Sequence, residues 1–247
     1  MLKQPPCALT DAIIKRQASS EKREPMPDAM LSPDEQAEFS RAAETVRRAT
    51  VNALTADRSG PFAIRFIGNL QRSVDQVLHA ALAAGLKIDC RAGCSHCCNA
   101  RVEALDPEVF RIAAALKKRP PAALAALTER LREHAALARS SAAQTHRMPC
   151  PLLENDLCTV YEVRPATCRK AHSLDVRQCA TPGADIPQRL DLALKAEALC
   201  KGSADAYQHM GLAAGGHELG QALLLALTDP TAESRWMNGE AVFGTIG

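Results

Sequence analysis

Aromatic side chains are scarce in this chain of 247 residues: they make up 3% of it, whereas hydrophobic residues make up 47%. A core built from these residues must consist largely of Ala and Leu. Such a core favours closely packed helices over a β-sandwich, because strands prefer β-branched and aromatic residues. The sequence therefore predicts a mainly α protein, and no segment alternates regularly enough between apolar and polar residues to predict a strand.

An excess of charge of one sign is also missing. The chain has 30 basic and 28 acidic residues, which gives a formal net charge of +2. Charges so nearly balanced provide no electrostatic attraction for nucleic acid or for an anionic membrane. We therefore expect neither as a partner.

Long apolar runs are absent as well. The longest ones, at 122–127 and 222–227, are far shorter than the roughly 18 residues of a membrane span. The first residues, MLKQPPCALTDAIIKRQ, include no apolar stretch typical of a signal peptide. We therefore expect a cytoplasmic protein, and in a reducing compartment clustered cysteines are more often metal ligands than disulfides.

Helix-forming patterns divide the chain into four predicted segments. These are a mobile N-terminal tail (1–31), an N-terminal helical hairpin (32–88), a cysteine-cluster metal-binding domain (89–182) and a C-terminal helical segment (183–247). The expected architecture is a helical scaffold around a loop-rich cysteine-cluster domain.

Helix start and stop signals predict the individual helices. Ser32 followed by Pro33 and Glu35 is typical of a helix start. The predicted helices run from Ser32 to about Ala56, from near Phe62 to Gly85, from Asp106 past Leu116, from Pro121 to about Ala138, from about Pro187 to Cys200, and around Leu219 to Leu227, with shorter ones near Ala12 to Gln17 and Val163 to Arg169.

Cysteine, by contrast, is abundant: there are ten cysteines, and eight of them lie between Cys90 and Cys179. The first four form the stretch CRAGCSHCC, in which Gly93 permits the left-handed turn that such loops often need. Closely spaced thiols can wrap a single metal ion, and ligation by sulfur alone suits zinc, Cu(I) or iron–sulfur centres. The predicted metal ligands are Cys90, Cys94, Cys97, Cys98, Cys150, Cys158, Cys168 and Cys179.

Disulfide bonding or plain core burial is the alternative for these cysteines. The adjacent pair Cys97–Cys98 argues against disulfides, because a bond between sequence neighbours is strained. Cys7 and Cys200 lie away from the cluster and are expected to be bystanders. Eight thiols allow two four-sulfur sites, or one such site with an auxiliary set nearby.

Several other residues near the cysteines suggest supporting roles. Six cations flank the cysteines in sequence and could stabilise a negatively charged metal site, or could be ordinary surface cations: Arg91, Arg101, Arg147, Arg164, Arg169 and Lys170. His96 and His172 are expected beside the ligands rather than among them. Tyr161 is expected to pack in the core or against the cluster.

The two cysteine blocks together resemble the YkgJ-type cysteine-cluster family, which is described as a zinc- or iron-chelating domain. The first block is Cys90-x3-Cys94-x2-Cys97-Cys98, and the second is CPLL from Cys150, CTVYEVRP from Cys158 and then Cys168-Arg169, with Cys179 following. The resemblance covers about residues 88–182. It implies a metal-binding domain and no particular substrate.

Three enzymatic interpretations are weaker. The spacing of Cys90, Cys94 and Cys97 matches a radical S-adenosylmethionine cluster, but the chain lacks the alternating strand–helix pattern of that barrel. Residues 217–221 nearly match HExxH, yet Gln221 replaces the second histidine ligand, and His217 is expected to face solvent or cap a helix. Flagellin lysine N-methylases have a similar cluster, which implies an iron–sulfur centre acting with S-adenosylmethionine on a protein lysine.

The sequence thus predicts a metal-binding protein that chelates zinc or an iron–sulfur cluster, with a protein partner as a further possibility. The alternative is an iron–sulfur-dependent enzyme, either redox-active or similar to a protein lysine methyltransferase. No catalytic residue can be assigned, because no set of Ser, His and carboxylate stands at motif spacing.

Overall fold

A computed structural model describes residues 31–138, 148–181 and 185–244. The described residues do not include the predicted N-terminal tail up to residue 30, which contains Cys7 and the expected short helix. Arg147 also lies outside the described residues. The prediction of a mainly α fold is confirmed. The helices are α2 (Pro33–Ala56), α3 (Gly60–Phe66), α4 (Gly68–Ala83), α5 (Asp106–Leu116), α6 (Pro121–Ala138), α7 (Ala166–Lys170), α8 (Val176–Ala180), α9 (Leu190–His209), α10 (Leu219–Thr228) and α11 (Ala232–Met237), with 3-10 turns η1 (His96–Asn99) and η3 (Tyr161–Val163).

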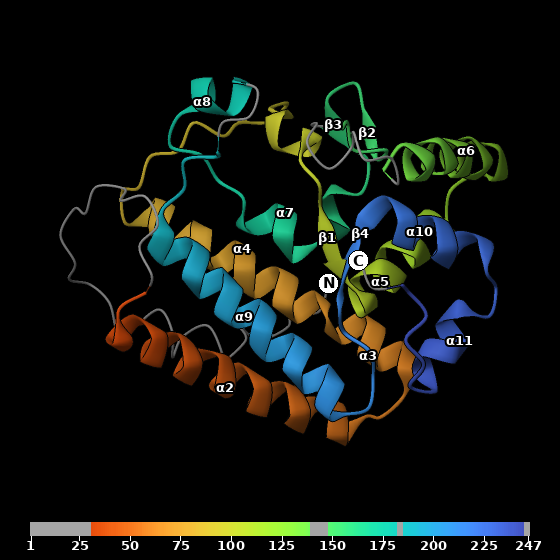
Figure 1. The fold of residues 1–247 in the computed structure, drawn as a ribbon, viewed down its shortest axis with the longest axis horizontal. Coiled ribbons are helices and arrows are strands. Elements are labelled where there is room, and N and C mark those ends of the chain that lie inside the picture. Colours follow the sequence, from red (N-terminus) through yellow and green to blue (C-terminus); the bar gives the residue numbers. More distant parts are fainter. Residues whose placement is uncertain (1–30, 139–147, 182–184, 245–247) are drawn as a thin grey trace, which may run out of the picture.

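Three long helices, α2, α4 and α9, form the base of the molecule (Figure 1). Helix α2 begins as the sequence predicts: the Ser32 side chain accepts from the Glu35 amide, and the Glu35 side chain accepts from the Ser32 amide. Helix α9 runs alongside α2, with α4 on its other side. Gly202 permits this close approach, because a Cβ there would lie 2.3 Å from the Ala43 carbonyl oxygen of α2.

Two predicted helices differ from those observed. The single helix expected from Phe62 to Gly85 is two helices, α3 and α4, with a break at Ile67. Helix α9 extends to His209, well beyond the expected end at Cys200. Its second half is rich in Ala, Gly and Ser, so it lacks the apolar stripe that would have predicted it, and its packing against α2 stabilises it instead.

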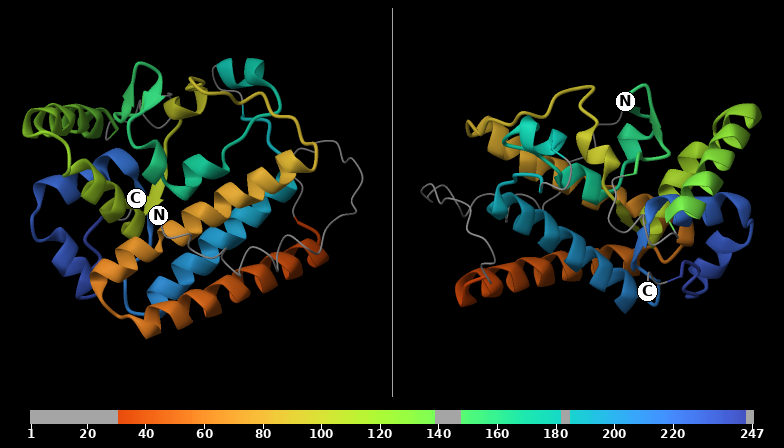
Figure 2. Two further views of the ribbon diagram at one scale, coloured as in Figure 1. Left: turned by 180° about the vertical axis from the view of Figure 1, so that it is seen from behind. Right: turned by 45° about the horizontal axis from the view of Figure 1, so that its top comes forward.

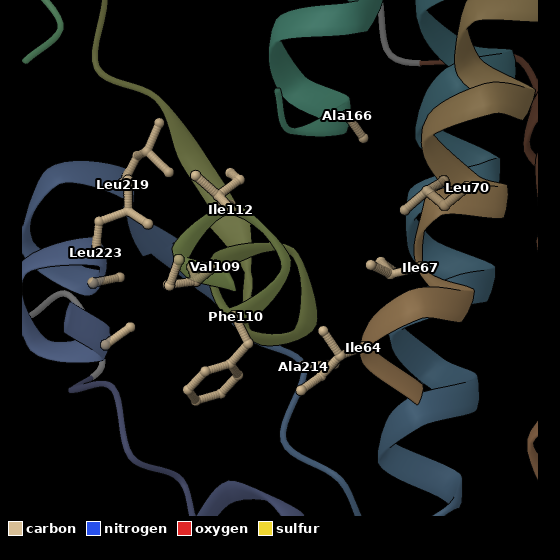
Figure 3. Packing of buried hydrophobic residues seen from close by; sticks show 14 of the residues in the cluster. Ile64, Ile67, Leu70, Val109, Phe110, Ile112, Ala166, Ala214, Leu219 and Leu223 are labelled. Atoms are coloured by element: carbon tan, nitrogen blue, oxygen red, sulfur yellow. The ribbon is translucent and has the colours of Figure 1, made fainter. Parts of the chain in front are cut away.

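The core lies where α3 and α4 face α5, α7 and α10. Figure 3 shows Ile64, Ile67 and Leu70 directed toward Phe110 and Ala166. Leu219 and Leu223 of α10 pack from the other side of α5. As the composition indicates, Leu, Ala, Val and Ile supply most of this interior.

The strands are short and occur as two antiparallel pairs. Strand β1 (Glu103–Leu105) pairs with β4 (Gly216–Glu218), and β2 (Leu153–Glu154) pairs with β3 (Leu157–Cys158). Asn155 and Asp156 join the second pair, both with positive φ (51° and 60°), as in a tight I′ hairpin turn. Strands of two or three residues are too short to leave a periodic pattern, which explains why the sequence does not predict them.

The loop-rich cysteine segments form a layer over the helical base. Figure 2 shows residues 86–100 and 148–181, with η1, α7, α8 and the β2–β3 hairpin, stacked on the side of α4 away from α2. Helices α5, α6, α10 and α11 lie beside this layer (Figure 1). Within the described residues, no helix has the length and hydrophobicity that crossing a membrane requires.

A buried ion pair fixes the end of the described chain to β4. His217 is 6% exposed, and its Nε2 lies 2.9 Å from Oδ2 of the fully buried Asp106. Its Nδ1 lies 3.2 Å from the Gly244 carbonyl oxygen. The Asp106 carboxylate and the Gly244 carbonyl are both hydrogen-bond acceptors, so both hydrogen bonds form only when the His217 ring carries a proton on each nitrogen. The expectation that His217 faces solvent or caps a helix is therefore wrong.

This pair predicts a pH-dependent stability. Burial lowers the pKa of His217, but Asp106 and the Gly244 carbonyl raise it more, and its net pKa lies above the ordinary value. The stabilisation is therefore complete below the unfolded pKa of about 6.5 and is lost as the pH rises through the folded pKa. His217→Gln should lower the unfolding free energy by about 2 kcal/mol at pH 6 and by less at alkaline pH, as measured by urea denaturation. The variant His79→Gln, at an exposed site on α4, is the control. Parallel pH profiles for wild type and His217→Gln would contradict the assignment.

Candidate metal centre

The first cysteine loop is a series of tight turns. Gly93 has φ +80°, which confirms the left-handed conformation expected of it. The Cys94 amide donates to the Arg91 carbonyl (3.0 Å) and the Cys98 amide to the Ser95 carbonyl (2.9 Å). These turns place four thiols within nine residues of chain.

The second block of cysteines is folded against this loop. The Cys150 amide donates to the Cys98 carbonyl (2.8 Å), and the Ser95 hydroxyl donates to Asp156 at the tip of the hairpin (2.7 Å). Strand β3 carries Cys158, helix α7 carries Cys168 and helix α8 carries Cys179. Segments far apart in sequence therefore meet in one layer.

Cys90 and Cys179 meet at Ser173. Its amide donates to Cys90 Sγ (3.2 Å), and Cys179 Sγ donates to its hydroxyl (3.0 Å). Burial is the main cause that raises the pKa of Cys90; the Ser173 amide lowers it, and the neighbouring thiols Cys94, Cys97 and Cys179 raise it again. We call Cys90, Cys94, Cys97 and Cys179 the Cys90 set.

The other four cysteines are also mutual neighbours. Burial raises the pKa of Cys150 to about 11, although the Leu152 amide lowers it, and Cys158 raises it further. Burial likewise raises the pKa of Cys168, and Cys150 and Cys158 add to this effect. We call Cys98, Cys150, Cys158 and Cys168 the Cys150 set.

In the sequence, the whole Cys150 set lies between Cys97 and Cys179 of the Cys90 set, and the two sets adjoin at the Cys97–Cys98 pair. The mutual influence of these two thiols raises the pKa of Cys97 and lowers that of Cys98. Cys97 also raises the pKa values of Cys90, Cys150 and Cys168, so it adjoins both sets. Sequence order alone would have grouped Cys98 with the first loop and Cys179 with the second block.

The donor chemistry of these sets fits zinc or iron. Thiolate sulfur is a preferred ligand of both metals, and amide donors to sulfur, such as Ser173 N–H on Cys90, stabilise its charge. Among the residues that the structure describes, no three His, Cys, Asp or Glu side chains surround a common point as they would around a bound ion. Binding would therefore require the thiols of a set to turn toward one centre.

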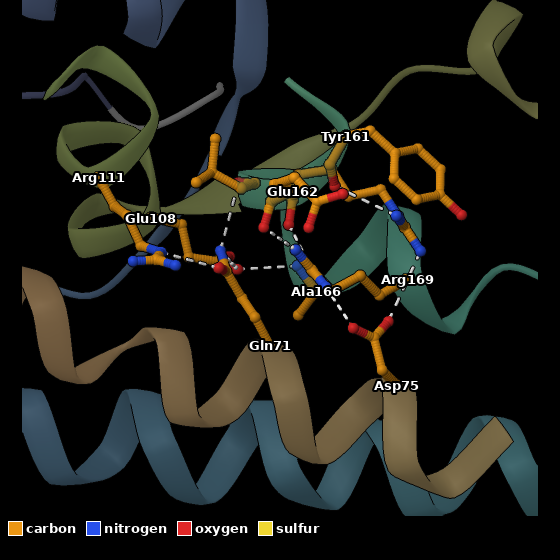
Figure 4. A network of polar contacts seen from close by, with 10 residues as sticks. Gln71, Asp75, Glu108, Arg111, Tyr161, Glu162, Ala166 and Arg169 are labelled. Atoms are coloured by element: carbon orange, nitrogen blue, oxygen red, sulfur yellow. Dashed lines mark hydrogen bonds and ion pairs between the residues drawn. The ribbon is translucent and has the colours of Figure 1, made fainter. Parts of the chain in front are cut away.

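A buried carboxylate attaches the second block to the helical base. Glu108 of α5, 1% exposed, accepts from the Ala166 amide of α7 (2.8 Å), from Gln71 of α4 (3.1 Å) and from the Leu105 amide (3.2 Å). Figure 4 shows this network between α4, α5 and α7. Burial raises the pKa of Glu108, and the amide and Gln71 donors offset part of this effect.

Arg169 is a second attachment, one residue after Cys168. Its guanidinium is buried, pairs with Asp75 of α4, and donates to the carbonyls of Arg164 (2.8 Å) and Glu162 (2.6 Å), as Figure 4 shows. Three backbone or carboxylate acceptors thus hold one side chain. Arg169 and Glu108 together fix the position of α7 and of its cysteine.

Two histidines, His96 and His172, lie near the cysteines in sequence. His172 is buried, with Nδ1 2.9 Å from the Lys170 carbonyl and Nε2 accepting from the Arg189 amide (2.9 Å). Both ring nitrogens are occupied, so His172 shapes the chain beside Ser173 and is not available as a ligand. His96 lies in η1, directly before Cys97.

Other supporting residues differ from expectation. Tyr161 is 58% exposed and neither enters the core nor seals the cysteines; the Arg164 guanidinium lies 3.7 Å from the centre of its ring. Arg164 and Lys170 pair with Asp75 and Glu197, so carboxylates offset part of the positive charge around the cysteines. Cys200 lies on α9, packs against the core and belongs to neither set; burial raises its pKa to about 12.

Comparison with known proteins agrees with this chemistry. Residues 89–189 match the model of the CxxCxxCC family, which is described as "Putative zinc- or iron-chelating domain". No curated protein and no solved structure matches the chain. The matched segment begins directly before Cys90 and includes every member of both cysteine sets. The predicted family resemblance is confirmed over residues 89–189, which match the CxxCxxCC family model.

Proposed function

We propose that this protein binds zinc or iron through two four-cysteine sites, one formed by the Cys90 set and one by the Cys150 set. The observation that supports the proposal is the proximity of the thiols: Cys94, Cys97 and Cys179 lie near enough to Cys90 to act on its pKa, and Cys150, Cys158 and Cys168 lie near enough to Cys98 to act on its pKa. Four thiolates complete the coordination of a structural zinc ion and are also the ligands of common iron–sulfur clusters.

The short elements around the Cys150 set suggest that a metal bound there holds the loops together. Residues 148–181 contain a two-stranded hairpin, the 3-10 turn η3 and two helices of five residues, which bury little apolar surface by themselves. A metal ion joining Cys98, Cys150, Cys158 and Cys168 would link the first loop, the hairpin and α7. The metal would therefore act as the core of this segment, as zinc does in small metal-dependent domains.

Titration of the reduced, metal-free full chain with Co²⁺ tests the two-site arrangement. Thiolate-to-cobalt charge-transfer absorbance should saturate at two equivalents in the wild type. Cys94→Ser and Cys158→Ser should each abolish one of the two equivalents, because they lie in different sets, whereas Cys200→Ala should retain both. A single equivalent that both serine variants abolish would indicate one shared centre instead. Visible absorbance and acid-labile sulfide in anaerobically prepared protein would identify iron–sulfur rather than zinc.

A further inference from the structure

A small cleft opens beside Cys150, on the side where α6 meets the start of α10. Its volume is about 40 Å³, and Arg101, His134, Cys150, Glu218 and Gly220 are among the residues that line it. This space is large enough for a few water molecules or a small ion. It gives solvent a route to a cysteine that is otherwise half-buried.

The His134 ring in this cleft is held in one orientation. Its Nε2 lies 3.1 Å from Glu218 Oε1, while Glu218 also accepts from the amides of Gly220 (3.0 Å) and Gln221 (2.8 Å). A carboxylate that receives these donors is an acceptor for His134 too, so Nε2 carries the proton. In the neutral ring Nδ1 then keeps its lone pair, and none of the described residues forms a hydrogen bond with it.

Gly220 provides the room for this arrangement. A Cβ at this position would lie 2.4 Å from Cδ2 of His134. Glu218 is also close enough to Cys150 for its charge to act on the thiol, although burial and the nearby Cys158 act on that thiol more strongly. The cleft therefore contains an oriented nitrogen donor, a carboxylate that fixes it and a thiol of the Cys150 set.

We propose that this cleft is the entry site for the Cys150 set, where His134 Nδ1 and Cys150 Sγ first take up a divalent zinc or ferrous ion. The inference rests on the proposed function, since the ion must have a thiol set to reach. A histidine whose other nitrogen donates to a carboxylate is the usual form of a metal-binding histidine, so Glu218 is a positioning residue. The ion loses bound water as it is captured, and each thiol that ligates it releases a proton to solvent, with no change of oxidation state.

A site with two donors binds a metal ion briefly rather than permanently. Within the described residues, His134, Cys150 and Glu218 do not form a group that could retain an ion here. Arg101 also lines the cleft, and its positive charge opposes tight retention of a cation. An incoming ion can thus be captured and then passed to the thiols.

Isotope exchange on the zinc-loaded full chain tests this inference. Protein loaded with zinc-65 is mixed with unlabelled zinc, and release of the label is followed. His134→Gln should slow exchange by about tenfold without changing the zinc content. His134→Cys, which restores a soft donor, should exchange faster than His134→Gln, and Glu218→Gln should slow exchange as well. His79→Gln, at an exposed position on α4, should exchange like the wild type.

The outcomes separate the inference from the proposed function. Equal exchange rates in wild type and His134→Gln, with full zinc content in both, would overturn the entry site and leave the thiol sites intact. A slow rate in His134→Cys equal to that of His134→Gln would also overturn it, because a merely structural role gives no rescue by a ligand. A wild type that takes up no zinc or iron at all would instead refute the proposed function.

Discussion

Removal of the metal with a chelator, under anaerobic and reducing conditions, is expected to lower the unfolding free energy by on the order of 10 kcal/mol. The reason is that the cysteine layer contains little regular secondary structure. Between residues 148 and 181 the longest helices, α7 and α8, have five residues each, and β2 and β3 have two each. Helices and hairpins of this length are not stable in isolation. Cross-linking through thiolates would supply the missing stability.

After metal removal, structure should be lost in the cysteine layer before the whole chain unfolds. After chelation, amide hydrogen exchange should accelerate first in residues 89–99 and 148–181, while α2 and α9 remain protected by their own packing. Thermal melts followed by circular dichroism measure the total effect. The variant Cys200→Ala should respond to the chelator as the wild type does, because Cys200 belongs to neither set. An unchanged melt and unchanged exchange after complete metal removal would show that the metal has no structural role.

Replacement of Glu108 by alanine is expected to have the largest effect of any single substitution discussed here, about 3–5 kcal/mol of unfolding free energy. The substitution would leave the amides of Ala166 and Leu105 and the Gln71 side chain without their acceptor in a buried position. An unsatisfied buried donor costs roughly 1–3 kcal/mol. The Ala166 amide is at the start of α7, so the position of Cys168 should loosen as well.

Urea denaturation and Co²⁺ titration of Glu108→Ala measure these two effects. We expect metal affinity to fall by about tenfold, as for other residues that orient a ligand through a hydrogen bond. Glu197→Ala is a matched control, because this partly exposed glutamate pairs with Lys170 near the surface, and its loss should cost at most about 1 kcal/mol. Equal stability of Glu108→Ala and Glu197→Ala would contradict the role assigned to Glu108.

Local signals in the sequence predicted the features that depend on a few neighbouring residues. Ser32 and Glu35 predicted the start of α2, and Gly93 predicted a left-handed turn, because each depends on hydrogen bonds or dihedral angles within one turn of chain. The family resemblance likewise follows from the short-range spacing of the cysteines. These features are independent of what lies across the molecule.

Contacts between distant segments could not be predicted in the same way. The assignment of Cys98 to one set and Cys179 to the other depends on how the hairpin and α8 fold back on the first loop, which the spacing of cysteines does not encode. His217 looked like a surface residue because its partner, Asp106, lies 111 positions away. His134 belongs to no motif, and the role proposed for it depends on Glu218 and Cys150, which line the same cleft.

The metal content of the natively folded protein tests the central claim most directly. The full chain, purified anaerobically without added chelator, is analysed for zinc, iron and acid-labile sulfide, and its free thiols are counted before and after denaturation. We predict two filled sites per chain, either as two zinc ions or as iron with matching sulfide, and no reaction of the eight cysteines of the two sets before the chain unfolds. A folded chain free of zinc and iron, with these cysteines reactive in the native state, would contradict the account.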